Sequence, residues 1–258
     1  MPSLSARSVV ASTLLGTLPP RLPGRLLVAF AEEFGINPGT TRVALSRMVD
    51  RGELTRDDDS VYHLAGDLLD RQGRQEAGLA AVTRAWDGDW EIHVVRTGGR
   101  DAGDRAALRR AAVHLGLAEH RDGVWMRPAN LDPQRLPSAR MVVAEQADRF
   151  VGRPDGSPAE LAAALFDLDA WSAATRRLVA SMEATSALLE ADGDVSLADG
   201  FELAASSLRH LVADPLLPPS LTPSGWPASD LRAAYDRYNR AYRARLSAFF
   251  RARSRVAG

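Results

Sequence analysis

Residues 23–64 constrain the fold of this chain more than any other stretch of its sequence. Apolar residues recur at helical spacing through residues 23–34, and Gly35 then interrupts the pattern. Asn37 and Pro38 follow, and they supply an N-cap and a first-turn proline for a second helix. This order predicts two helices joined by a tight turn.

The second predicted helix has one face that can pack and one face that is free. At about 100° per residue, one arc is mainly apolar and contains Ala44, Leu45, Met48 and Val49. The other arc contains Gly39, Thr40, Arg42, Val43, Ser46, Arg47 and Asp50. Arginine can donate to guanine, hydroxyls can reach phosphates or base edges, and valine can contact a thymine methyl. This face is typical of a recognition helix in a DNA major groove, and a helical packing unit that binds nothing is the alternative.

A β-hairpin, or wing, is predicted after this helix, which ends at Gly52. Two short strand-like runs, residues 54–56 and 61–64, flank an acidic tip. The tip carries three successive carboxylates, Asp57, Asp58 and Asp59, which a phosphate backbone would repel. We therefore expect the tip to stay away from DNA. The alternative is that this chain has lost or retuned its binding of an operator.

The expected DNA contacts fall on the recognition helix and on nearby cations. The predicted contact residues are Thr40, Arg42, Val43, Ser46, Arg47, Arg51, Arg56 and Arg7. The last three are expected to anchor phosphates, together with a first helix over residues 4–18. The net charge of the chain is −1, so DNA affinity has to come from a local patch. That patch is modest, because residues 1–56 contain seven arginines and four acidic residues.

Composition excludes several classes of protein. The chain has 258 residues, of which 45 % are hydrophobic, and this is enough for two or three compact domains. It contains no cysteine, which excludes disulfides, thiol catalysis and cysteine-ligated zinc. The apolar runs are too short to span a membrane and no signal-peptide pattern is present, so we expect a cytoplasmic protein.

The fold class predicted for the whole chain is α+β and mostly helical. The predicted divisions are a winged helix-turn-helix domain at residues 1–66, a connector helix at 67–88, a central ferredoxin-like domain at 89–157 and a helical C-terminal domain at 158–258. In the C-terminal part, a period of 3.6 residues predicts helices over residues 159–166, 171–189, 197–213 and 229–253.

The central domain is predicted from a change in the spacing at which apolar residues recur along the chain. Residues 90–95 alternate as a strand, and residues 104–117 form an alanine-rich amphipathic helix. Two strand-like runs lie on either side of Gly123, and residues 141–144 are the candidate for the last strand. The second helix of a ferredoxin-like fold is poorly marked, since prolines crowd residues 128–137.

Three separate stretches carry a resemblance to a known family. They are residues 42–49 (RVALSRMV) with Gly52, residues 86–90 (WDGDW), and residues 214–218 (DPLLP) followed by residues 225–227 (GWP). In this order the chain resembles the PaaX family of bacterial transcriptional regulators, known chiefly as repressors of phenylacetate catabolic operons. For the two later stretches we favour an architectural role over contact with a ligand.

The resemblance implies a fold and a mode of action. It implies an N-terminal winged helix, a central domain similar to a small CRISPR-associated nuclease fold, and a helical C-terminal domain. It also implies a homodimer that binds a partly palindromic operator in double-stranded DNA. In the best-known branch of the family, an aryl-acetyl coenzyme A thioester releases the protein from DNA, so the expected effector is of acyl-CoA type.

Enzyme motifs are not found. Gly-x-Ser-x-Gly, His-Glu-x-x-His and a glycine-rich phosphate loop do not occur, and His114, Glu119 and His120 lack metal-ligand spacing. A metal-dependent nuclease needs carboxylates near the end of the first central strand, where residues 95–98 offer none. We therefore expect no enzymatic activity, no cofactor and no bound metal.

The last predicted helix is rich in arginine. Residues 227–258 contain eight arginines and two acidic residues, with three tyrosines between them. An amphipathic helix that packs through its aromatic residues is the favoured interpretation. Phosphate contacts beside the operator, a cationic mouth for coenzyme A phosphates and a dimer interface stay open.

The predicted recognition helix indicates a DNA-binding regulator, and the resemblance implies that it is a ligand-released repressor of a catabolic operon. Two recognition helices of the dimer would enter successive major grooves, about 34 Å apart. The alternative is a winged-helix module that binds protein without specific DNA binding.

Overall fold

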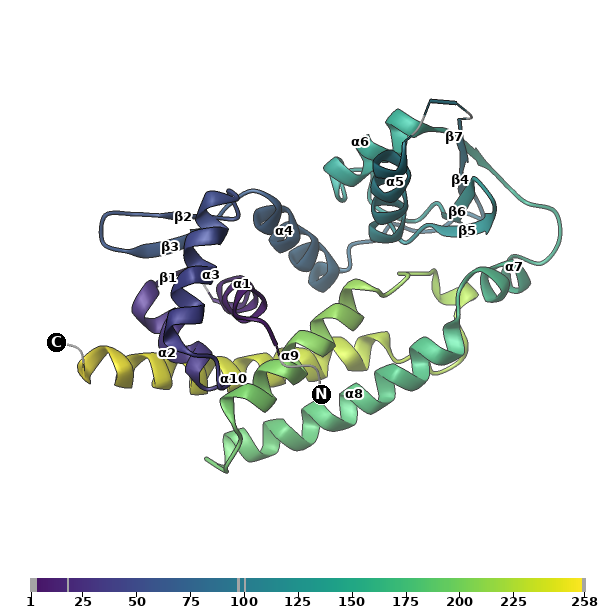
Figure 1. Cartoon of the computed structure of the whole chain (residues 1–258). Coiled ribbons are helices and arrows are strands. Elements are labelled where there is room, and N and C mark those ends of the chain that lie inside the picture. Colours follow the sequence, from purple (N-terminus) through teal and green to yellow (C-terminus); the bar gives the residue numbers. More distant parts are fainter. Residues whose placement is uncertain (1–3, 18, 97, 100, 257–258) are drawn as a thin grey trace. The chain divides into compact units, whose positions relative to one another are not determined.

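A computed structural model describes residues 4–17, 19–96, 98–99 and 101–256 (Figure 1). Contacts between residues group the chain into two compact units. The first unit takes in the described residues of Met1–Gly73, Ser181–Ser207 and Ala234–Gly258, and the second takes in Arg74–Ala180 and Leu208–Ala233. The helices predicted for the C-terminal part supply residues to both units, and the domain boundaries stay predictions.

The N-terminal part of the first unit contains three helices and a small sheet. The elements in chain order are α1 (Ala6–Gly16), β1 (Arg21–Pro23), α2 (Gly24–Glu32), α3 (Pro38–Asp50), β2 (Leu54–Arg56) and β3 (Val61–Leu64). The strands pair antiparallel in the order β1-β3-β2. Figure 1 shows the β2–β3 hairpin extending beyond the three helices. These helices and this hairpin follow one another in the order predicted for a winged helix-turn-helix, and Leu18 lies outside the described residues.

Strand β1 was not predicted, because the sequence pattern starts a helix at Pro23. The strand is only three residues long, and Arg21 pairs with His63 far along the chain. A three-residue run is too short to show a period of two, and its partner is fixed by tertiary structure. The helix itself begins one residue later than expected, at Gly24.

A single apolar core holds these elements. It contains Val10, Leu14, Leu27, Leu45, Met48, Leu54 and their neighbours, each almost completely buried. Burial of one such side chain contributes about 2 kcal/mol, so together they fix how α3 is rotated about its axis. In the same unit, Phe30 packs edge-to-face against Phe34, Phe201 and Phe249, and at a tilted angle against Phe250.

The central sheet of the second unit has a ferredoxin-like topology. Its elements are β4 (Trp90–Val95), α5 (Ala102–His114), β5 (Ala118–Arg121), β6 (Val124–Pro128), α6 (Pro137–Gln146) and β7 (Ala147–Gly152). The strands are antiparallel in the order β5-β6-β4-β7, which is the βαββαβ arrangement predicted from the sequence. Helices α5 and α6 pack on one face of this sheet (Figure 1).

The prediction of a strand at residues 141–144 is wrong. These residues lie in α6, and the last strand is β7, which follows immediately. Pro137 occupies the first turn of α6, where a proline is well tolerated, and Val143 is buried against α5. Packing therefore overrides the strand preference of the two adjacent valines.

Four of the remaining helices agree with the sequence patterns to within a few residues: α7 (Pro158–Leu165), α8 (Leu168–Glu190), α9 (Leu197–Val212) and α10 (Ala228–Val256). The other two elements are α4 (Asp67–Ala80) and a short 3₁₀ helix, η1 (Pro219–Leu221), which was not predicted. Helix α4 is shorter than the connector that was predicted to reach residue 88. Within the described part of the chain, no helix combines the length and the apolar character that crossing a membrane requires.

The buried guanidinium of Arg127 fixes the loop that follows α9. It donates to the carbonyl oxygen of Leu115 at 2.7 Å and to that of Pro215 at 3.2 Å. The side chain of Asn130 donates to the carbonyl oxygen of Leu216 at 2.8 Å. Arg127 is only 1 % exposed, and burial, with Arg135 and Arg140 nearby, lowers its pKa to about 10 although Glu91 acts in the opposite direction. These contacts give residues 214–218 the architectural role favoured from the sequence.

A buried carboxylate on β4 balances part of this charge. Glu91 is 3 % exposed and lies 3.3 Å from Arg149, 3.6 Å from Arg140 and 3.7 Å from Arg127. Burial alone would raise the pKa of Glu91, but interactions with His93, Arg140 and Arg127 outweigh it and lower the pKa to about 2. Glu91 therefore stays ionised inside the second unit.

Glu91→Gln is expected to destabilise the second unit at neutral pH. A carboxyl group whose pKa falls from 4.5 to about 2 on folding contributes on the order of 3 kcal/mol above pH 4.5, and this contribution is lost as the pH falls towards 2. Urea unfolding followed by tryptophan fluorescence measures it, because all five tryptophans lie in the second unit. At pH 7 the Glu91→Gln variant should unfold at a lower urea concentration than the parent protein, and its urea midpoint should depend less on pH below 4.5. The control Asp122→Asn, at an exposed position, should change neither the midpoint nor its pH dependence. An unchanged urea midpoint at pH 7 would contradict the assignment.

Candidate nucleic-acid interface

The turn between α2 and α3 positions the candidate interface. Gly35 lies in the turn after α2 and has a left-handed φ of 69°, a conformation that glycine adopts without strain. Asn37 then caps α3, and its side-chain oxygen accepts a hydrogen bond from the backbone N–H of Gly39 at 2.8 Å. Pro38 lies at the start of α3, where its missing N–H costs nothing. The start of α3 is therefore fixed locally, as its sequence predicts.

Helix α3 buries one face and exposes the other. Thr41, Leu45 and Met48 are buried and Ala44 and Val49 are half-buried. The exposed residues are Gly39, Thr40, Arg42, Val43, Ser46, Arg47 and Asp50, the same set that the sequence placed on the free arc. Val43 is 51 % exposed, which leaves its methyl groups free for an apolar contact.

The arginines of the candidate interface differ in whether they already have ion-pair or hydrogen-bond partners. Within the described residues, Arg42, Arg47 and Arg51 form no ion pair and are exposed. Arg56 lies on the hairpin and donates to the hydroxyl of Ser60 at 2.7 Å. This leaves four guanidiniums with donors that can reach phosphates or bases.

Arg7 is held differently from the other predicted contact residues. Its guanidinium donates to both carboxylate oxygens of Glu53, at 2.8 Å from Nε and 2.9 Å from Nη2. The hydrogen bond to Glu53 raises the pKa of Arg7. A phosphate contact by Arg7 would have to share or break this pair, so Arg7 is a weaker candidate than the cations of α3.

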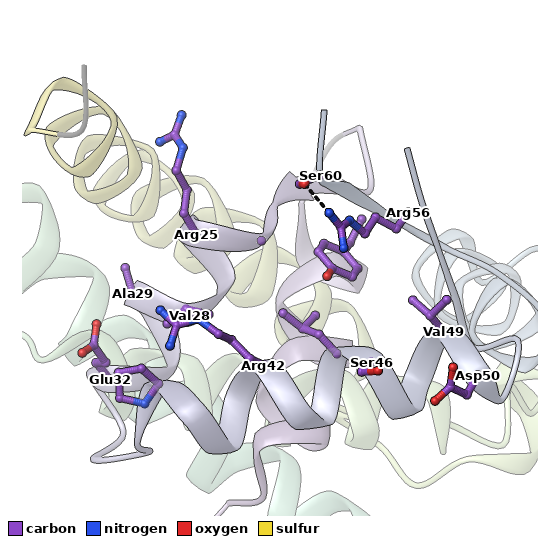
Figure 2. A pocket seen from close by; sticks show the side chains of 14 residues that line it. Arg25, Val28, Ala29, Glu32, Arg42, Ser46, Val49, Asp50, Arg56 and Ser60 are labelled. Carbon is purple, nitrogen blue, oxygen red and sulfur yellow. Dashed lines mark hydrogen bonds between the residues drawn. The ribbon is translucent and has the colours of Figure 1, made fainter. Parts of the chain in front are cut away.

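A groove lies beside α3, between that helix, α2 and the hairpin. It has a volume of about 680 Å³, and Figure 2 shows side chains from all three elements around it. Arg25, Arg42 and Arg56 line it together with the acidic residues Glu32 and Asp50. Arg25 was not predicted as a contact residue, because its helical spacing shows only that it is exposed. Its place in the same groove as Arg42 is visible only once α2 and α3 are packed.

One carboxylate of the acidic tip, that of Asp57, accepts hydrogen bonds from other residues of the hairpin. The side chain of Asp57 accepts hydrogen bonds from the backbone N–H of Val61 at 2.8 Å and from the ring of His63 at 3.2 Å. These interactions lower the pKa of Asp57. Asp58 and Asp59 remain exposed, so the tip presents two carboxylates to its surroundings.

Asn37→Ala is expected to weaken α3 at its first turn. Loss of the cap leaves the Gly39 N–H without its acceptor, and such substitutions cost about 1 kcal/mol. Urea unfolding followed by circular dichroism should show the loss, while Asn37→Asp should retain most of the stability because it keeps an acceptor and places a negative charge at the helix start. Equal stability of the alanine variant and the parent protein would show that the cap contributes nothing.

Comparison with known proteins places the whole chain in one family. Residues 5–68 match the family described as "PaaX-like protein", residues 83–163 match the "PaaX protein central Cas2-like domain", and residues 166–252 match the "PaaX-like protein C-terminal domain". No curated protein matches the chain. A solved structure described as "Uncharacterized protein Rv0674 from Mycobacterium tuberculosis" is 41 % identical, with a TM-score of 0.71 over 95 % of this chain and 99 % of that one. The chain therefore belongs to the PaaX family of transcriptional regulators.

Proposed function

We propose that this protein is a sequence-specific DNA-binding regulator that represses a catabolic operon and is released by an effector. The observation that carries the proposal is the exposed face of α3, where hydroxyls, a valine and arginines that have no ion pair within the described residues stand on a helix whose other face is buried. Such a helix can enter a major groove without any change in its own packing.

Each side chain of the exposed face suits one kind of DNA contact. Arg42 and Arg47 can donate two parallel hydrogen bonds to guanine O6 and N7, and Val43 can contact a thymine methyl group. Thr40 and Ser46 can bond to phosphates or base edges. Arg51 and Arg56 lie beyond the end of α3 and on the hairpin, where they suit phosphate contacts better than base contacts. Arg25 joins this group because it lines the same groove as Arg42.

The exposed carboxylates of the hairpin limit where DNA can lie against the protein. Asp58 and Asp59 would be repelled by a phosphate backbone, so the operator lies against α3 and the base of the hairpin, away from its tip. The same two carboxylates favour the rival function, in which the winged helix binds a basic surface of another protein. Salt dependence and sequence preference separate the two functions.

The regulator is proposed to act as a homodimer, because the family implies partly palindromic operators. Two copies of α3 about 34 Å apart would read two half-sites one helical turn apart. The proposed effector is an acyl-CoA thioester, by resemblance to the family. It releases DNA only to the extent that it binds the DNA-free arrangement more tightly than the DNA-bound one.

The double variant Arg42→Ala, Arg47→Ala is expected to lose operator discrimination and to keep its fold. One bidentate arginine–guanine contact contributes about 1–3 kcal/mol of discrimination, so specific affinity should fall by at least tenfold. Fluorescence anisotropy against the DNA upstream of the protein's own gene measures it, with a scrambled duplex beside it. The melting temperature should stay nearly unchanged, because both side chains are exposed.

Arg121→Ala is the matched control, since this arginine is also exposed but lies in the central sheet. It should bind the operator as the parent protein does. Sedimentation of the protein with one operator duplex should give two chains per site. If the parent protein shows neither a sequence preference nor weaker binding at higher salt, the DNA-binding function is wrong and the protein-binding alternative takes its place.

A further inference from the structure

The central sheet holds a second cavity, which the DNA-binding function does not use. It has a volume of about 770 Å³ and is lined by residues of β4, β7 and α6, and by the segments on either side of them. Glu91, His93 and Arg149 face it from the sheet, and Arg140 and Val143 face it from α6. Its volume is within the range of about 300–1,000 Å³ that small-molecule pockets span.

His93 is buried in the wall of this cavity without hydrogen-bond partners. It is 5 % exposed, and within the described residues neither ring nitrogen has a hydrogen-bond partner. The nearest carboxylate oxygen, on Glu91, lies 3.7 Å from Nε2, which is too long for a hydrogen bond but close enough for an electrostatic interaction that lowers the pKa of Glu91. Buried polar groups are nearly always paired in folded proteins, so an unpaired imidazole that lines a cavity indicates a missing partner there.

The cavity also carries more positive than negative side chains. Arg84, Arg96, Arg140 and Arg149 line it, against two carboxylates, Glu91 and Asp148, so the lining has an excess of two positive charges. Glu91 is shared between Arg140 and Arg149, and Asp148 pairs with Arg96 at 2.7 Å. Backbone carbonyl oxygens accept further hydrogen bonds from Arg96 and Arg140, but the two carboxylates balance only two of the four positive charges of the lining, which favours an anionic ligand.

Arg84 is the most available of these cations. Its Nε donates to the carbonyl oxygen of Ala129 at 3.0 Å, and this bond orients the side chain. Within the described part of the chain it has no carboxylate partner, and its two terminal nitrogens make no hydrogen bond that would occupy them. A guanidinium held at Nε presents its remaining donors as a fork that suits a carboxylate or a phosphate.

The rest of the lining is apolar. Leu115, Leu131, Pro133, Val143 and Val151 complete the wall. An inorganic ion would leave this surface without a partner, whereas an anion attached to an apolar group would cover it. The positively charged part and the apolar part of the lining together fit an organic anion that also carries an apolar group.

We propose that this cavity binds an organic anion, a carboxylate or phosphate joined to an apolar group, with Arg84 and His93 contacting the oxygens. The inference rests on the proposed function in one respect: the organic anion is taken to be the effector that releases the regulator from DNA. His93 donates to an oxygen of the ligand from one ring nitrogen, Arg84 donates from its free terminal nitrogens, and the apolar wall holds the remainder.

Isothermal titration calorimetry on the full chain, without DNA, tests the site. Three probes separate the sources of the anion: phenylacetate carries a carboxylate, phenyl phosphate carries a phosphate on the same ring, and phenylacetyl coenzyme A carries phosphates at a distance from the ring. At least one probe should bind at a single saturable site. Arg84→Ala should weaken that binding at least tenfold, as expected for the loss of a charged hydrogen bond.

His93→Leu distinguishes a ligand contact from a structural role. Leucine fills a similar volume and removes an imidazole whose ring nitrogens have no hydrogen-bond partner within the described residues, but it also removes the interaction with Glu91 at 3.7 Å, so the melting temperature without ligand should fall only slightly. Binding of the probe should nevertheless weaken at least tenfold. If the leucine variant fails to fold, Arg84→Ala decides alone, because its side chain is exposed. The matched control is Arg121→Ala, which does not line the cavity and should bind as the parent protein does.

The inference is overturned if the parent protein binds none of the three probes at millimolar concentration, or if Arg84→Ala binds as tightly as the parent protein. Operator binding is measured separately on the same preparations. A parent protein that binds the probe but no operator contradicts the proposed function and leaves the cavity as a ligand site. One that binds the operator but no probe contradicts only the present inference.

Discussion

The burial of Thr41, Leu45 and Met48 is the interaction on which the candidate interface depends. These residues recur on one side of α3, and once they enter the core the helix has no freedom to rotate about its axis. The opposite side then has to face outward, with Arg42, Val43 and Arg47 on it. A helix with the same exposed residues but a weaker apolar face would not present them in a fixed direction.

Charge is used differently in the two units. On α3 the cations are exposed and carry no ion pairs within the described residues, so they can exchange water for phosphate at little cost. In the central sheet Arg127 is buried, and it satisfies its donors with carbonyl oxygens of residues 115, 128, 215 and 216. Such a network is costly to break, because removal of one partner leaves a buried charge uncompensated. The first arrangement suits reversible contact and the second suits architecture.

Arg7 and the wing show that ion pairs within the unit reduce the number of charged residues that are strong candidates for contacting DNA. Both were singled out from charge alone, and the structure gives each a partner inside the unit, Glu53 for Arg7 and His63 for Asp57. A charged residue that already has a partner gains less from a new one, since the new contact replaces an existing interaction. The arginines of α3 and Arg25, which have no ion pair in the described part of the chain, are therefore the stronger candidates. In the second unit Arg84 stands out for the same reason, and His93 stands out because its ring nitrogens have no hydrogen-bond partner there.

The sequence by itself determined the elements whose signals are local. The cap at Asn37, the two faces of α3, the hairpin and the long C-terminal helices follow from periodicity and from residues next to one another in the chain. Tertiary structure decided the rest, because the causes lie far apart in sequence: β1 pairs with β3, residues 141–144 become helical against α5, and Arg25 and Arg42 line one groove. The cavity around His93 likewise needs residues from 84 to 151, and no local pattern shows that their side chains converge.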